Sequence, residues 1–93
     1  MSDLHILGEI GMLPYLMPGG LQMLMEIKAI EPDDFERIKV LIWRGLGDII
    51  KEKCKLDDKI AVKGKLVKRD GETVLLAETV SLITVMEKEN VAE

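Results

Sequence analysis

The feature that most constrains the fold is a change of hydrophobic period within VLIWRGLGDIIKEKC (Val40–Cys54). Up to Trp43 the residues alternate, with one uniformly apolar parity and one mixed parity. The apolar parity consists of Ile38, Val40 and Ile42, and the mixed parity consists of Arg37, Lys39, Leu41 and Trp43. Because a half-buried strand turns its apolar parity inward, the alternation predicts that Trp43 faces outward. From Gly45 the apolar residues follow helical spacing, which predicts a short amphipathic helix to about Lys55.

The rest of the chain contains four further segments that we expect to be strands. Leu4–Gly11 forms the first, and MLPYLMPGG after it, with two prolines and a glycine pair, is expected to be a loop. Leu21–Ile30 alternates, although Leu24 and Ile30 break the pattern. The last two strands are residues 60–67 and 73–83. They flank Asp70-Gly71, a dipeptide suited to a type I′ hairpin turn.

The order of these elements predicts the fold class. Three strands, a helix and two more strands is the order of the OB-fold, a small five-stranded barrel with one helix between strands 3 and 4. We therefore expect an all-β OB-fold domain over residues 1–85, followed by a polar C-terminal tail over residues 86–93.

Composition limits the class of protein. The 93 residues suffice for one small domain. A formal net charge of −4 argues against coating nucleic acid by bulk attraction, but is compatible with a local basic face. Cys54, the only cysteine, cannot form an internal disulfide and is expected to be a buried hydrophobe. No basic segment followed by a long apolar run is present, so we expect a cytoplasmic protein with no membrane association.

Four segments also resemble the bacterial single-stranded DNA-binding (SSB) proteins. LHILGEIG is similar to the opening V-x-L-x-G-x-L strand of that family, and YLMPGG is similar to its Tyr-Thr-Pro-Ser-Gly turn. VLIWRGLGDI resembles V-V-x-W-G-K-L-A-E, matching at Trp43 and Leu46, with Asp48 in place of Glu. DDKIAVKGKL is similar to G-D-x-V-x-V-x-G-x-L. The resemblance extends from Leu4 to about Ile83.

The resemblance implies that bases stack on an exposed aromatic ring while basic side chains follow the phosphate backbone. The family's stacking aromatic corresponds to Trp43. A second family aromatic, six residues earlier, corresponds to Arg37, and Phe35 on the same parity is a candidate substitute. The cations expected on the binding face are Lys28, Arg37, Lys39, Lys63, Lys65, Lys68 and Arg69. The family also implies a homodimer or homotetramer.

The chain departs from the family pattern in four places, one of which is Arg44-Gly45, where the family has Gly-Lys after the tryptophan. EPDDFE is short and acidic where the family has a long basic and aromatic loop, and the turn at Asp70-Gly71 replaces a long arm. The acidic C-terminal tip ending in Pro-Phe is absent from EKENVAE. These differences predict weaker binding than that of a typical family member, with a site of a few nucleotides per subunit.

Each candidate has a structural alternative. Trp43 could instead fill a core or subunit contact, and Lys63, Lys65 and Lys68 could form a solvated strand face that prevents sheet aggregation. His5 has no His or Cys at ligand spacing, so no metal site is expected. We find no nucleophile elbow, phosphate-binding glycine loop or catalytic triad order, and expect a non-enzymatic protein without a cofactor.

Two hypotheses of function follow. The first is a protein that binds single-stranded DNA, or RNA, since stacking does not distinguish the two. The alternative is an OB-fold protein-interaction module, related to primosomal replication proteins or to subunits of replication and repair assemblies, with weak or no nucleic-acid binding.

Overall fold

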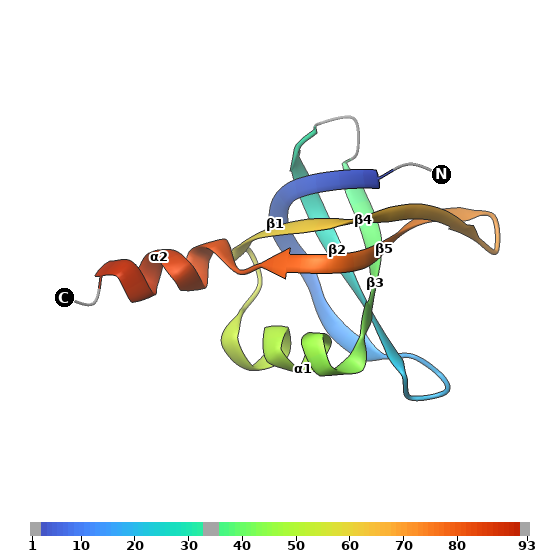
Figure 1. The fold of residues 1–93 in the computed structure, drawn as a ribbon, viewed down its shortest axis with the longest axis horizontal. Coiled ribbons are helices and arrows are strands. Elements are labelled where there is room, and N and C mark those ends of the chain that lie inside the picture. Colours follow the sequence, from blue (N-terminus) through green and yellow to red (C-terminus); the bar gives the residue numbers. More distant parts are fainter. Residues whose placement is uncertain (1–2, 33–35, 92–93) are drawn as a thin grey trace.

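The computed structural model, which describes residues 3–32 and 36–91, is a closed five-stranded barrel with two helices (Figure 1). The elements are β1 (Asp3–Leu16), β2 (Gln22–Glu31), β3 (Arg37–Trp43), α1 (Arg44–Lys53), β4 (Lys59–Arg69), β5 (Glu72–Ser81) and α2 (Ile83–Val91). Around the barrel the strand order is β1-β2-β3-β5-β4, and β1 pairs with β4 to close it. Only the β3–β5 pairing is parallel. The predicted OB-fold class is confirmed.

The barrel interior is filled by the apolar parities that the sequence predicts. Ile38, Val40 and Ile42 of β3 are buried, and so are Ile60 and Val62 of β4. They belong to one continuous cluster with inward residues from β1, β2 and β5. Burial of this apolar surface is the main favourable contribution to folding.

Strand β1 is longer than predicted, because MLPYL continues the strand where a loop was expected. Its pairing with β2 shifts register between Ile10 and Met12 and again between Met12 and Tyr15. Such irregularities bend a strand and tolerate a residue without an N–H group, so Pro14 can lie buried within β1. The pattern of prolines and glycines in the sequence does not distinguish a bent strand from a loop.

Helix α1 closes one end of the barrel (Figure 1). It begins directly after β3, with Trp43 as its extended N-cap residue. Ile50 and Cys54 are buried in the core, and burial raises the pKa of the Cys54 thiol. Cys54 is thus a buried hydrophobe, as predicted. A Cβ at Gly47 would collide with the Met23 side chain, so this glycine allows α1 to lie directly on β2.

The segment between α1 and β4 is fastened to β1 by backbone hydrogen bonds. The Ile10 N–H donates to the Asp58 carbonyl, and the Asp57 N–H donates to the Ile10 carbonyl, both at 2.9 Å. The buried Asp58 carboxylate accepts a hydrogen bond from the Lys55 N–H at 3.1 Å. Asp58, one of the residues shared with the SSB pattern, therefore shapes this turn.

The β4–β5 hairpin turns at Asp70 and Gly71, whose φ angles of 50° and 82° are both positive, as the predicted type I′ turn requires. The hairpin extends beyond the barrel on the side opposite α2 (Figure 1).

The C-terminal segment forms α2, where a strand end and a polar tail were expected. Strand β5 ends at Ser81 and the helix starts at Ile83. Leu82 and Val85 pack against the barrel core, and the Thr84 hydroxyl accepts a hydrogen bond from the Lys59 N–H at 2.7 Å. These contacts anchor the first turn, and the rest of α2 projects from the barrel (Figure 1). The domain limit predicted at residue 85 falls inside this helix and stays a prediction.

Substituting Val40 by Asp tests the strand assignment. Val40 is fully buried, and a buried unpaired carboxylate costs several kcal/mol, comparable to the total stability of about 5 to 15 kcal/mol expected for a small domain. We expect Val40→Asp to be unfolded by circular dichroism and thermal melting. Thr79→Asp places the same charge on an exposed position of β5 and should remain folded. A cooperative melt for Val40→Asp would contradict the assignment.

Candidate nucleic-acid interface

The outer face of β2 and β3 changes from apolar to charged along its length. The cross-strand neighbours on this face are Gln22 with Trp43, Leu24 with Leu41, Glu26 with Lys39, and Lys28 with Arg37. We call this surface the β2–β3 face. An aromatic ring and an apolar pair thus lie at one end of this face, and charged side chains lie at the other end. This is the combination of groups that binds bases and phosphates together.

Trp43 lies at the apolar end of the β2–β3 face. Its side chain is 64% exposed, which confirms the outward orientation predicted from the alternation. The six-membered part of the indole lies against Gly45, where any Cβ would collide with the ring. A fixed, exposed ring supported by the first turn of α1 is suited to stacking on a flat ligand.

Leu24 and Leu41 form the centre of a second apolar cluster, outside the barrel. Both point outward, yet their side chains are only 9% and 3% exposed. They pack with Val74 of β5, and Met12, Met17, Val67 and Leu76 surround the three. The β1–β2 loop and the β4–β5 hairpin therefore both contribute side chains that cover the middle of this face. The break in alternation at Leu24 was the sequence signal for this cluster.

Four of the seven predicted cations are paired with carboxylates. Arg37 contacts Glu26 at 3.1 Å, Lys39 contacts Glu72 at 2.9 Å, and Lys65 is 3.9 Å from Glu78. Lys28 pairs with Asp57. Lys63, Lys68 and Arg69 form no ion pair with another described residue. The basic face predicted from the sequence is thus largely neutralised by acids of the same chain.

The Lys39–Glu72 pair joins β3 to the β4–β5 hairpin near its tip, where Glu72 pairs with Arg69. The pKa of Lys39 is raised, first by its hydrogen bond to Glu72, then by Coulomb attraction to the same carboxylate, with smaller contributions from Glu26 and Tyr15. Lys39 is therefore protonated at neutral pH, and its charge is already paired with the Glu72 carboxylate.

The predicted site residues divide into three groups. Trp43, Lys28, Arg37 and Lys39 share the β2–β3 face. Lys65 pairs with Leu76, which borders the second apolar cluster. Lys68 and Arg69 are near the tip of the hairpin. Lys63 lies apart, between His5 of β1 and Thr79 of β5. Phe35 lies outside the described residues.

Tyr15 is a surface aromatic that the sequence analysis did not select. It pairs with Leu24 in the β1–β2 ladder and is 46% exposed. Because the segment around Tyr15 was expected to be a loop, its place on the sheet next to β2 was not predicted. The signal that could have found it is its place in YLMPGG, directly before the turn into the strand that neighbours Trp43.

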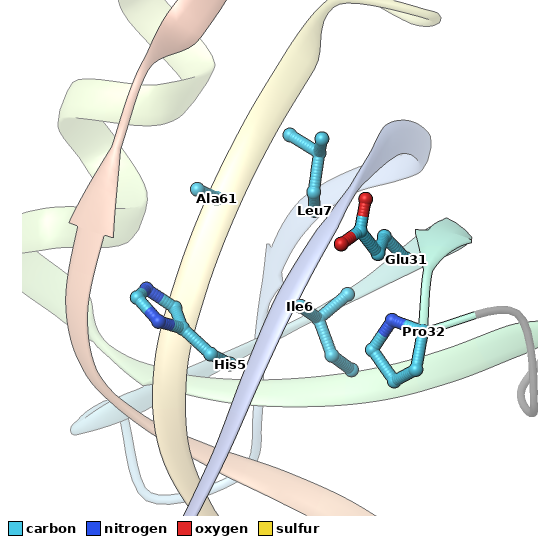
Figure 2. Close-up of a pocket in the computed structure, with 6 residues that line it drawn as sticks. All are labelled: His5, Ile6, Leu7, Glu31, Pro32 and Ala61. Carbon is cyan, nitrogen blue, oxygen red and sulfur yellow. The ribbon is translucent and has the colours of Figure 1, made fainter.

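A pocket of about 460 Å³ lies at the other end of the β1–β2 ladder (Figure 2). It is lined by His5, Ile6, Leu7, Glu31, Pro32 and Ala61. It does not include any of the predicted site residues. Among the described residues, no three His, Cys, Asp or Glu side chains are grouped closely enough to hold a metal ion. No helix of the described chain is long and apolar enough to cross a membrane.

No family model and no curated protein sequence matches the chain. Solved structures, in contrast, match it over most of its length. The SSB domain of a Synechococcus protein is similar with a TM-score of 0.64 and 19% identity, covering 86% of this chain and 93% of that chain. A small single-stranded DNA-binding protein from Streptomyces coelicolor matches with a TM-score of 0.65 and 13% identity, covering 87% and 91% respectively.

The second single-stranded DNA-binding protein of Mycobacterium smegmatis matches with a TM-score of 0.69 and 18% identity, and 87% of each chain is covered. At these identities the likeness establishes the architecture of the chain. The fold implied by the sequence resemblance is confirmed: the chain has an SSB-like OB-fold.

Proposed function

We propose that this chain is a non-enzymatic protein that binds single-stranded nucleic acid, with DNA as the leading ligand, on the β2–β3 face. The observation that carries the proposal is the exposed, supported ring of Trp43 at the end of an apolar cluster, with cations further along the same strands. The solved structures that the chain resembles include proteins named for binding single-stranded DNA, which supports the same function.

In the proposed mechanism a base stacks on the free face of Trp43, and phosphates of the same strand contact Lys39 and Arg37. Stacking contributes about 1 to 3 kcal/mol per base and accepts any base. The phosphates replace Glu26 and Glu72 as partners of these cations, so each phosphate contact is an exchange of anions. This exchange makes binding weaker than on a face of unpaired cations.

The same ion pairs favour a second candidate, a protein-interaction module. A neutralised face with an exposed ring suits an apolar protein surface as well as a base. Leu21 is 78% exposed, and its carbonyl accepts a hydrogen bond from the N–H of Arg44, the residue after Trp43. Leu21 therefore lies next to Trp43. Quenching of Trp43 fluorescence by oligo-dT, reversed by salt, favours the first function; an unchanged spectrum favours the second.

Trp43→Ala tests the stacking residue. We expect single-strand affinity to fall by about 1 to 3 kcal/mol, measured by fluorescence anisotropy of labelled oligo-dT, because one base loses its platform. The melting curve should be unchanged because the ring is exposed. Trp43→Phe keeps a smaller ring and should retain part of the affinity. An unfolded Trp43→Ala protein, or blue-shifted native fluorescence, would instead place the ring in a structural contact.

The charged end of the face gives a second test. Glu72→Gln should free Lys39, tighten oligo-dT binding and steepen the dependence of log K on log salt by roughly 0.7, the value of one phosphate contact. Lys39→Ala should weaken binding and make the slope shallower by a similar amount. Glu52→Gln is the matched control, because it removes the same charge from an exposed position on α1. Equal gains from both Gln variants would indicate an effect of net charge alone.

We also propose that the chain is a homodimer or homotetramer. β1 pairs with β4 from Asp3, but its pairing with β2 begins only at Leu7, so one edge of its first residues is open within the described chain. Open strand edges favour pairing with another chain. Sedimentation velocity at micromolar concentration should show a dimer or larger species. A single species of about 10.4 kDa would rule this assembly out.

A further inference from the structure

Tyr15 and Trp43 lie on opposite sides of β2 on the same outer surface. Tyr15 is opposite Leu24 in the β1–β2 pairing, and Trp43 is opposite Gln22 in the β2–β3 pairing. Cross-strand neighbours point to the same side of a sheet, and Leu24 points outward into the second cluster. Both aromatic rings are therefore on one surface, separated by the width of β2.

The spacing of the two rings follows from sheet geometry. Two strand spacings of about 4.8 Å and two residues of about 3.4 Å place the two backbone positions roughly 12 Å apart. Bases stacked at about 3.4 Å per nucleotide cover this distance in three or four steps. Gln22 and Leu24 lie between the two positions on β2. A short single strand crossing β2 would meet one ring near each end.

We propose that Tyr15 is a second stacking platform, so that the binding path runs across β2 from Trp43 to Tyr15. This inference rests on the proposed function and defines the direction and length of its site. The bound segment spans about four or five nucleotides, crossing the strands over the apolar cluster.

The surroundings of Tyr15 support a binding role. Its side chain is about half exposed, and no described residue forms a hydrogen bond with its hydroxyl. Tyr15 is also close enough to Lys39 to contribute to the raised pKa of this lysine. A strand stacked on Tyr15 would thus have a cation of the β2–β3 face within reach of its backbone.

The test is Tyr15→Ala in the full chain, with oligo-dT binding followed by anisotropy and by Trp43 quenching. We expect affinity for an oligomer of about six nucleotides to fall at least fivefold, the lower limit for loss of one stacked base. For an oligomer of about two nucleotides, which cannot span both rings, the loss should disappear. Quenching of Trp43 at saturation should remain, because the first platform is intact.

Two further variants separate stacking from packing. Tyr15→Phe keeps the ring and should bind within about twofold of the original protein. Leu16→Ala is the matched control, because Leu16 is the neighbouring residue, is similarly exposed and pairs with the inward-facing Met23. It should leave affinity unchanged. Melting curves establish that each variant is folded. If Tyr15→Ala proves unstable, Tyr15→Leu, which keeps apolar bulk without an aromatic ring, tests the ring in its place.

The outcomes distinguish this inference from the function on which it rests. If Tyr15→Ala binds as well as the original while Trp43→Ala binds more weakly, the path does not reach Tyr15 and this inference is wrong, but the proposed function stands. A loss that is equal for short and long oligomers would also overturn the path. If oligo-dT neither binds nor quenches Trp43 in the original protein, the proposed function fails and the second platform fails with it.

Discussion

The structure depends on strands β2 and β3 being apolar on both faces. Their inward parity fills the barrel, and on their outward side Leu24 and Leu41 are also removed from water. That second burial requires cover, which comes from Met12 and Met17 on one side and from the β4–β5 hairpin on the other. The two flanking segments are thereby held at the rims of the β2–β3 face. In the proposed function, the apolar contact that stabilises the hairpin also sets where a single strand crosses the sheet.

The hairpin also neutralises part of the charge on this face. Glu72, at the start of β5, forms an ion pair with Lys39 of β3. Glu26 pairs with Arg37, and Asp57 pairs with Lys28. Exposed pairs of this kind contribute little to stability, because water screens them. Their larger effect is on the net charge of the surface. The aromatic and apolar part of the face is bordered by cations whose charge is already neutralised by carboxylates. Binding to such a surface depends more on stacking and less on the release of salt ions than binding to a face of unpaired lysines.

The sequence predicted those parts of the fold that depend on local periodicity. Ile38, Val40 and Ile42 show a period of two, and the change at Gly45 marks the helix, so the element order and the outward position of Trp43 could both be derived. The bent continuation of β1 could not, because Pro14 and the register shifts have no periodic signal. Helix α2 was missed because the barrel holds its first turn, at Leu82, Thr84 and Val85, whereas residues 86–89 are exposed and carry no helical pattern of burial. The ion pairs were missed because their partners, such as Lys39 and Glu72, are distant in sequence.

The choice between the two candidate functions depends on what can cover the exposed rings. A protein partner would have to bury Trp43 and Leu21 together, since they lie side by side at the end of the barrel near α1. A nucleic acid needs flat surfaces at the spacing of its bases and does not need Leu21. Tyr15 lies across β2 from Trp43, whereas Leu21 lies just before Gln22 at the start of β2. Two rings lie across the strands, and cations lie further along them. This arrangement therefore fits a linear ligand that crosses the sheet better than it fits a compact apolar protein surface.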